Sequence, residues 1–390
     1  MLNGAKQPRD LNGPRKITVM SNAANTLIRF RGHLLELLVR RGHDVHVLAP
    51  EYNTEQAKHL KDMGVTTHTY HIDRAGQNPL SDLRTLRDLT RWFRRERPDV
   101  SLTFFIKPNI YGGLAAALAR VSRRIGMVEG LGYLFISSGP DGLAKRASRT
   151  LAISLLRASF ARAHRVIFLN PDDRAEFVER RIVAQDCTML LGGIGVDLDE
   201  FVDTPVPAGP PSFLLIARML REKGVLEFVE AAGVLKREFT DARFRLVGGL
   251  DPSPGGISAD QMRAFAATGS VEWSGELPDV RPAIAEARVY VLPSYREGVP
   301  RSTQEAMAMG RAVVTSDVPG CRETVVPGVN GFFVAPRDAQ SLVDAMRRFC
   351  TDPDLAVSMG RESRLIAEAR FDVKKVDERL YATLMGDDQA

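Results

Sequence analysis

Short apolar runs alternate with helical patterns along the first half of the chain. Runs rich in β-branched and aromatic residues predict buried strands, and longer segments with apolar positions three and four residues apart predict helices. The predicted strands are residues 16–20, 44–49, 65–70, 100–105, 126–129 and 165–169. The predicted helices are residues 26–42, 80–97, 109–123, 141–163 and 171–181. This alternation is typical of right-handed β–α–β units on a parallel sheet.

The same rhythm restarts in the second half. The predicted strands there are residues 212–217, 244–247, 271–273, 288–292, 312–315 and 331–334. The predicted helices are residues 224–239, 261–268, 280–287, 302–310 and 339–350. We therefore predict an α/β fold with two Rossmann-like, doubly wound domains facing each other across a cleft. Such sheets bind ligands at the carboxyl ends of their strands, so the cleft is the expected site.

A proline-rich stretch, residues 203–211, separates the two halves and has the composition of an interdomain linker. We predict a disordered leader over residues 1–15, a first domain over 16–203 and a second domain over 204–371. Residues 372–390 are predicted to form a helix that packs back toward the first domain.

Length and composition narrow the class of protein. A chain of 390 residues fits two ordinary domains, and it has no apolar run long enough for a transmembrane helix. The leader lacks the apolar core of a signal peptide. Three widely spaced cysteines fit a reducing cytoplasm and argue against disulfides or a zinc site. No histidine pattern of a metalloenzyme is present.

Charge is distributed unevenly. Residues 1–200 contain 30 Lys and Arg against 21 Asp and Glu, whereas the remainder contains 23 against 27. The first half therefore carries +9 and the second −4, which suggests that the first half faces an anionic partner. No nucleic-acid-binding module is recognisable, so we expect no nucleic acid and favour a membrane surface or a phosphate-bearing acceptor.

Two glutamates, Glu297 and Glu305, form the most informative pattern in the chain. Glu297 lies in the loop that leaves the strand predicted at 288–292, and Glu305 lies in the first turn of the next helix. Gly298, Val299 and Pro300 keep the loop tight and bring its backbone close to a ligand. A helix N-terminus suits a phosphate, so the two carboxylates could hold hydroxyls of a transferable sugar and of a ribose.

The pattern also has a purely structural interpretation. Ser302-x-x-Glu305 is a capping box, which would explain Glu305 without any ligand, and Glu297 could be an ordinary solvated loop residue. The sequence of this segment alone does not decide between the two interpretations.

Other candidates follow the strands of the second half. Arg218 and Lys223 come after the strand at 212–217, where two cations and a helix N-terminus suit a diphosphate leaving group without a metal ion. Their alternative role is as solvated surface charges, and we favour the functional one. Gly248 and Leu277 lie in loops after the next two strands and could approach a base or ribose, although a simple tight turn explains Gly248 equally well.

In the first half, Asn22, Lys107, Glu129 and Gly130 follow strand ends. They could contact an acceptor, but three of them also have a purely structural interpretation: helix capping for Asn22, and exposed loop charges for Lys107 and Glu129. The first strand is not followed by G-x-G-x-x-G, which argues against a nicotinamide-dependent oxidoreductase. Asp197-Leu198-Asp199 has the spacing of a metal-binding D-x-D, but its position beside the linker favours a structural turn.

The predicted helix at 141–163 is amphipathic and basic. Arg146, Arg149 and Arg157 are interspersed with an apolar face. The residues assigned to that face are Leu143, Ala147, Leu151, Leu155 and Phe160. Such a helix could lie on an anionic membrane, although most helices of this kind cover a sheet.

These motifs together resemble the family-4 retaining glycosyltransferases of the GT-B fold, over nearly the whole chain. The resemblance rests on E-x7-E at Glu297 and Glu305, and on Arg218 with Lys223. Further matching strings are Gly195-Val196-Asp197, Phe168-Leu169-Asn170-Pro171-Asp172-Asp173, Pro319-Gly320-Cys321-Arg322-Glu323-Thr324-Val325 and Lys107-Pro108-Asn109-Ile110-Tyr111-Gly112. They are similar to the subgroup that adds a hexose or N-acetylhexosamine to a polyprenyl-diphosphate-linked sugar in bacterial glycan assembly.

The resemblance implies a UDP-sugar co-substrate, no metal or other cofactor, and a peripheral location at the inner face of the cytoplasmic membrane. It also implies that Glu305 binds ribose, that Arg218 and Lys223 bind the diphosphate, and that Glu297 binds the transferred sugar. The backbone of Gly298–Pro300 would lie near the sugar and phosphate. Many members have a histidine where this chain has Glu129-Gly130-Leu131-Gly132, and the family's glycine-rich first loop is missing.

The sequence therefore predicts a metal-independent retaining glycosyltransferase. A nucleotide-sugar 2-epimerase of similar fold and a non-catalytic nucleotide-sugar-binding protein are the alternatives. The transferred sugar, the acceptor glycan, the linkage and the oligomeric state are not encoded in any pattern that we recognise.

Overall fold

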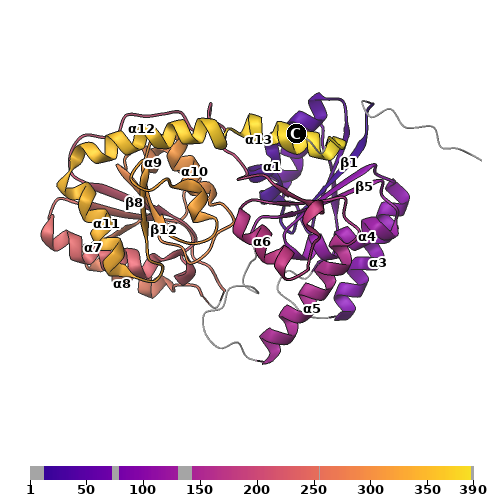
Figure 1. The fold of residues 1–390 in the computed structure, drawn as a ribbon, viewed down its shortest axis with the longest axis horizontal. Coiled ribbons are helices and arrows are strands. Elements are labelled where there is room, and N and C mark those ends of the chain that lie inside the picture. The colour runs from indigo at the N-terminus through magenta and orange to yellow at the C-terminus, as the bar shows by residue number, and fades with distance from the viewer. Residues whose placement is uncertain (1–12, 73–78, 131–142, 254, 388–390) are drawn as a thin grey trace, which may run out of the picture. The chain divides into compact units, whose positions relative to one another are not determined.

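A computed structural model describes residues 13–72, 79–130, 143–253 and 255–387 (Figure 1). The chain forms two compact units. The first comprises the described residues up to Phe168, together with Arg174–Leu191 and those from Asp377 onward. The second comprises Leu169–Asp173 and Gly192–Val376. The chain therefore passes from one unit to the other more than once.

The first unit is built on a parallel sheet of seven strands in the order β3-β2-β1-β4-β5-β6-β7. Its strands are β1 (Lys16–Met20), β2 (Asp44–Ala49), β3 (Thr66–Thr69), β4 (Val100–Phe104), β5 (Arg123–Val128), β6 (Arg165–Phe168) and β7 (Thr188–Leu190). Its helices are α1 (Ala24–Arg40), α2 (Thr54–Asp62), α3 (Pro79–Glu96), α4 (Gly113–Leu118), α5 (Leu143–Phe160), most of α6 (Pro171–Glu179) and most of α13 (Val373–Met385). The strands between the edges are mostly buried and rich in apolar residues because helices cover them, although they include the buried polar residues Thr18, His46, Ser101 and Thr103.

The second unit repeats this plan with six parallel strands in the order β10-β9-β8-β11-β12-β13. Its strands are β8 (Ser212–Ile216), β9 (Arg243–Val247), β10 (Glu272–Trp273), β11 (Val289–Leu292), β12 (Ala312–Ser316) and β13 (Gly331–Val334). Its helices are α7 (Val225–Glu238), α8 (Ala259–Ala267), α9 (Arg281–Ala285), α10 (Arg301–Ala308), α11 (Ala339–Thr351) and α12 (Pro353–Arg370).

In both sheets the order of the strands reverses at the first strand of the unit, so that later strands are added on its other side. In the second unit β8 pairs with β9 on one side and with β11 on the other, so the switch point lies between β8 and β11. In the first unit it lies between β1 and β4. Ligands of open parallel sheets bind beyond the carboxyl ends of the strands at this point. The predicted doubly wound α/β architecture of each half is confirmed.

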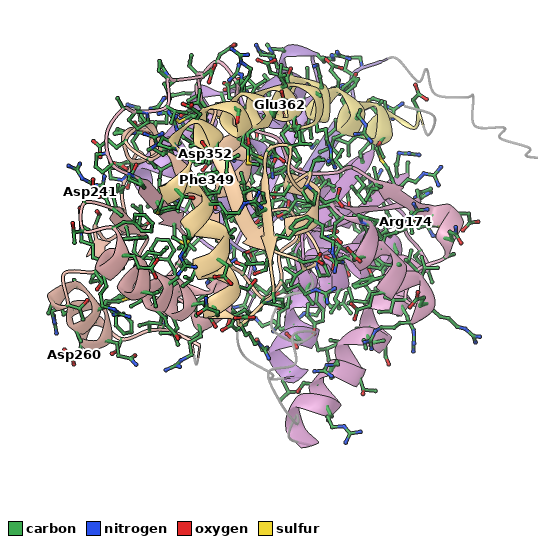
Figure 2. All side chains as sticks on the ribbon, turned by 60° about the vertical axis from the view of Figure 1, so that its left-hand side comes forward. Arg174, Asp241, Asp260, Phe349, Asp352 and Glu362 are labelled. Carbon is green, nitrogen blue, oxygen red and sulfur yellow. The ribbon has the colours of Figure 1, made fainter. Side chains whose placement is uncertain are left out.

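Local capping fixes several helix ends. Asn53 and Gln56 form a reciprocal capping box at the start of α2. Asp352 follows the last residue of α11 and caps α12 by accepting a hydrogen bond from the Asp354 N–H, while Phe349 of α11 is buried (Figure 2). Such caps satisfy N–H groups that have no partner within the helix.

The proline-rich stretch at 203–211 does not mark the passage between units; it lies within the second. Buried arginines hold it there. Arg288 donates hydrogen bonds to the carbonyls of Pro207 and Gly209, and Arg311 donates to Thr204 and Ile284. The chain enters the second unit earlier, at Gly192, because the next residues pair with the segment before α13 through Val196.

The part of the C-terminal helix α13 that follows Val376 is held to the rest of the first unit by hydrogen bonds. Arg41 donates to Glu378, Arg123 donates to the Thr383 carbonyl, and Arg15 donates to the Met385 carbonyl. Asp377 is buried on the same helix. Burial raises the pKa of Asp377 to about 7, although the positive charge of Arg31 opposes that shift.

We expect Asp377→Asn to remove a pH dependence of stability. The pKa of Asp377 in the folded protein lies above the ordinary value of 3.8, so the folded state is penalised as pH rises from about 4 to about 7. The variant should melt a few degrees higher than the wild type at pH 8 and differ little at pH 4. Thermal unfolding at both pH values checks this. Glu378→Gln, a half-exposed neighbour, is the control, and parallel wild-type and Asp377→Asn curves would contradict the expectation.

Candidate functional site

The loops on either side of the second switch point are joined by an ion pair. Lys223 follows β8 and Glu297 follows β11. The Lys223 Nζ donates to Glu297 Oε1 over 2.5 Å, and the Ser294 hydroxyl donates to the same oxygen over 2.7 Å. The two charged side chains are 21% and 12% exposed, so the pair is sheltered yet reachable. The structure thus brings together two residues that are 74 positions apart in the sequence.

Two glycines allow these loops to pack closely. Gly224 has φ +72°, and a Cβ there would lie 2.2 Å from the Pro293 carbonyl oxygen. Gly320, in the loop after β12, has φ +78°, and its Cβ would lie 2.3 Å from the carbonyls of both Glu297 and Gly298. A side chain at either position would push the Glu297 loop away, so only glycine is compatible with this geometry.

Arg218 lies in the same β8 loop and is 65% exposed. Its guanidinium donates to Asp251 Oδ2 over 2.5 Å. Burial raises the pKa of Asp251, but hydrogen bonds from Ser253 and the charge of Arg218 outweigh it and lower the pKa overall. Asp251 therefore stays ionised at neutral pH. Sequence reasoning missed Asp251 because only the fold places the loop after β9 beside Arg218.

Glu305 lies one position beyond the first turn of α10, because that helix begins at Arg301. The capping-box interpretation is wrong: the N-cap is Pro300, and it makes no side-chain cap. Ser302 is instead in contact with the Tyr290 hydroxyl at 2.6 Å. Glu305 accepts a hydrogen bond from Arg301 over 2.8 Å, which is an ordinary i,i+4 pair.

The charges of both glutamates act on one buried hydroxyl. Tyr290 is fully buried in β11, and burial raises the pKa of its hydroxyl. The negative charges of Glu305 and Glu297 raise that pKa further. Tyr290 was not singled out from the sequence, where it looks like any strand aromatic.

A buried thiol lies near the pair but is not suited to act as a nucleophile. Cys321 is inaccessible, and burial together with the charge of Glu297 raises the pKa of its thiol to about 12. The thiol therefore remains protonated at neutral pH, where only the thiolate is strongly nucleophilic.

The weaker candidates of the second unit have local explanations. A Cβ at Gly248, whose φ is +145°, would lie 1.7 Å from the Ala217 carbonyl oxygen, so this glycine is required by packing between two strand ends. Leu277 is half-buried in the loop after β10. Asp197 accepts hydrogen bonds from the N–H groups of Asp199 and Glu200, which confirms the predicted structural turn.

The four first-unit candidates do follow strand ends, but two of them are engaged by internal ion pairs. Lys107 lies after β4 and donates to Asp82 over 3.2 Å. Glu129 lies after β5 and accepts from the fully buried Arg31, so it is no ordinary loop acid. The sequence analysis did not single out Arg31. Its position among the apolar residues of α1 could have indicated a buried ion pair.

Asn22 does not cap α1, since the N-cap is Ala23 and it has no side-chain hydrogen bond. Gly130 has φ +141°, a conformation that favours glycine. The rest of the predicted glycine-containing loop, residues 131–133, lies outside the described residues.

Comparison with known proteins decides the family. Residues 27–193 match the family described as glycosyl transferase 4-like domain, and residues 210–352 match glycosyl transferases group 1. The chain is 30% identical over 380 residues to the N,N'-diacetylbacillosaminyl-diphospho-undecaprenol alpha-1,3-N-acetylgalactosaminyltransferase of Campylobacter jejuni, covering 94% of this chain and 96% of that protein. The chain belongs to the group 1 glycosyltransferases.

Other matches agree with this assignment. The capsular polysaccharide biosynthesis glycosyltransferase CapM of Staphylococcus aureus is 21% identical, with 94% of this chain and 96% of that protein covered. HepE of Anabaena, solved with UDP and glucose, superposes with a TM-score of 0.76 at 18% identity, covering 95% of this chain and all of that one. WaaG, a glycosyltransferase of lipopolysaccharide biosynthesis, gives 0.74 at 15% identity, with 95% and 100% covered. The structural matches show the GT-B fold.

In this glycosyltransferase the second switch point offers two cations and three carboxylates. Lys223 and Arg218 are each held by a carboxylate, which fixes their positions before any ligand arrives. Preorganised cations of this kind can stabilise charge that develops on a leaving group. Within the described residues, no cluster of three or more His, Cys, Asp or Glu side chains could hold a metal ion.

Proposed function

We propose that this glycosyltransferase moves a hexose or N-acetylhexosamine from a UDP-sugar to a polyprenyl-diphosphate-linked sugar in bacterial glycan assembly. The observation that carries the proposal is the Lys223–Glu297 pair at the second switch point, with Arg218 and Glu305 nearby. The name of the Campylobacter relative specifies a diphospho-undecaprenol acceptor, and HepE was solved with UDP and glucose. Both support the proposed substrate classes.

The roles follow from the charges. The diphosphate lies against Lys223 and Arg218, Glu305 binds the ribose hydroxyls, and Glu297 binds hydroxyls of the transferred sugar. As the bond between the sugar C1 and the phosphate oxygen breaks, negative charge grows on the diphosphate, and fixed cations stabilise it. The acceptor hydroxyl attacks from the same face and gives its proton to the departing phosphate, so the configuration is retained without a covalent intermediate.

The test uses the full chain with a panel of radiolabelled UDP-sugars and bacterial lipid extract. Label in the lipid phase supports the proposal. An isomerised nucleotide sugar would instead indicate an epimerase, and binding without any product a non-catalytic protein. Activity should persist in EDTA, and loss that Mn²⁺ restores would overturn the metal-independent mechanism. The anomeric configuration of the product decides between retention and inversion.

We further propose that the enzyme is peripheral to the inner face of the cytoplasmic membrane. The described helices include none that is both long and apolar enough to cross a bilayer. The predicted apolar face of α5 is partly wrong: Leu151 is 58% exposed, whereas Ala152 and Leu156 are buried. Arg157 donates to carbonyls at the end of α6, so it is not free for lipid.

The outer face of α3 is a better candidate for the lipid contact. Arg84, Arg87 and Arg91 recur along it, are at least 64% exposed and share a single acid, Asp88. Leu83, which precedes Arg84 in the sequence, is 63% exposed. A basic row beside an exposed apolar residue fits an anionic membrane surface.

Replacing Arg84, Arg87 and Arg91 by Gln is expected to weaken binding to anionic vesicles by about 10²-fold, since each arginine near such a surface contributes about 1 kcal/mol. Binding should fall with salt and be weaker for neutral vesicles. UDP affinity should not change, because the donor site belongs to the second unit. Vesicle co-sedimentation measures this, with the exposed Arg263→Gln of α8 as control. Equal binding to neutral and anionic vesicles would contradict the proposal.

A further inference from the structure

The short segment Leu169–Asp173, which follows β6 and includes the first three residues of α6, belongs to the second unit, although β6 and the rest of α6 belong to the first. Asn170 and Asp173 of this segment are 0% and 1% exposed. Asn170 Oδ1 accepts from the Asp173 N–H over 2.8 Å, and Pro171 occupies the first position of α6. This is a common way to begin a helix and explains the local sequence.

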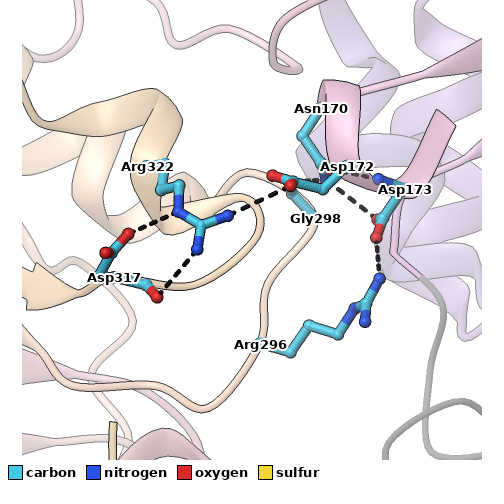
Figure 3. Close-up of polar contacts among 7 residues, drawn as sticks. All are labelled: Asn170, Asp172, Asp173, Arg296, Gly298, Asp317 and Arg322. Carbon is cyan, nitrogen blue, oxygen red and sulfur yellow. Dashed lines mark hydrogen bonds and ion pairs between the residues drawn. The ribbon is translucent and has the colours of Figure 1, made fainter. Parts of the chain in front are cut away.

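The same two side chains also hold the Glu297 loop (Figure 3). Asn170 Nδ2 donates to the Gly298 carbonyl over 2.6 Å, and Arg296 donates to Asp173 Oδ1 over 2.5 Å. The residues immediately before and after Glu297 are therefore each anchored by a buried polar group. Helix capping requires neither of these bonds.

We propose that Asn170 and Asp173 are positioning residues that set the Glu297 carboxylate for the transferred sugar. They act through the backbone of the loop and do not touch substrate. The Glu297 N–H also donates to the Pro319 carbonyl over 3.2 Å, and its carboxylate is fixed by Lys223. With the backbone held on both sides, small shifts that would misplace a reacting sugar are suppressed. The inference rests on the proposed role of Glu297 in sugar binding.

The ion pair between Asp173 and Arg296 is much more buried than the neighbouring pair between Asp172 and Arg322. Asp173 is 1% exposed and its partner Arg296 19%, so loss of either one leaves a sheltered charge without that partner. The adjacent Asp172 accepts from Arg322 over 3.2 Å, but these side chains are 37% and 42% exposed. Exposed pairs contribute little, which makes Asp172→Asn a matched control one residue away.

The experiment compares UDP with UDP-sugar binding, together with turnover, in the wild type, Asp173→Asn, Arg296→Gln and their double variant. Asp173→Asn should lower kcat about tenfold or more and reduce the gain in affinity of UDP-sugar over UDP, with UDP affinity itself within about twofold of wild type. If Asp173 acts through Arg296, the double variant should lose no more than either single one. Asp173→Glu should recover part of the activity.

A merely structural role predicts another pattern. UDP and UDP-sugar affinity would fall together with the melting temperature, and the ratio of the two affinities would stay constant; that result, or variants that match Asp172→Asn, overturns the proposal. Should Asp173→Asn fail to fold, Arg296→Gln on the loop side carries the same prediction. Failure of the wild type to transfer any sugar would refute the proposed function instead, so the two failures are distinguishable.

Discussion

Lys223→Ala is expected to lower kcat by about 10²-fold or more, with a much smaller effect on the affinity for UDP-sugar. The ammonium is fixed against Glu297 at 2.5 Å before substrate binds, so it offers a preorganised charge for the departing diphosphate. Interactions that strengthen only as charge develops appear in kcat and not in binding. Steady-state kinetics with the donor found in the panel measure the effect.

Two comparisons make this expectation specific. Lys223→Arg keeps the charge but not the compact geometry, so it should retain an intermediate activity. Lys236→Ala on α7 removes a cation that donates to the Ala242 carbonyl, away from the loops of the site, and it should have wild-type kinetics. If Lys223→Ala raised KM and left kcat unchanged, that result would contradict the proposal that Lys223 stabilises the transition state.

Glu305→Ala is expected to weaken UDP binding about tenfold or more, since a carboxylate that accepts from both ribose hydroxyls makes charge-assisted hydrogen bonds worth about 1.5–3 kcal/mol each. The fold should be nearly unaffected because no capping box depends on this residue. Calorimetric titration with UDP and thermal unfolding measure the two effects separately.

Arg301→Ala is the matched control for Glu305→Ala. It removes the guanidinium that donates to Glu305 in an i,i+4 pair worth about a few tenths of a kcal/mol, and leaves the carboxylate in place. If Glu305 serves UDP, the Arg301 variant should bind UDP almost as well as wild type. Equal losses in both variants would mean that Glu305 acts only by holding Arg301.

Most of the fold could be predicted because buried strands of a parallel sheet are nearly continuous apolar runs. The strands at Lys16–Met20, Asp44–Ala49 and Gly331–Val334 have the predicted bounds. The helix α2 was missed because only Leu60 is buried on it, which leaves almost no apolar period to read. The three-residue strand β7 is too short for any period to emerge.

Those site residues that lie in short sequence motifs could be predicted. Lys223 and Glu297 could be identified because each follows a hydrophobic run that predicts a buried strand. Ser294, which donates to Glu297, and Asp251, which accepts from Arg218, could not be identified in this way. Nor could the anchors Asn170 and Asp173, because the roles of all four depend on which loops meet in three dimensions. The capping-box interpretation failed for a related reason: α10 begins after Pro300, and the Tyr290 hydroxyl of β11 donates to the Ser302 hydroxyl.

The repeated passage of the chain between units has a consequence for biosynthesis. On the ribosome the second unit has all of its residues once Val376 has been made, whereas the first still waits for the segment that begins at Asp377. Arg15 and Arg41, which donate to that segment, are synthesised 370 and 337 residues before their partners Met385 and Glu378. The first unit is therefore completed after the second, and a chain that terminates just before Asp377 lacks most of α13 from its first unit while its second unit has all of its residues.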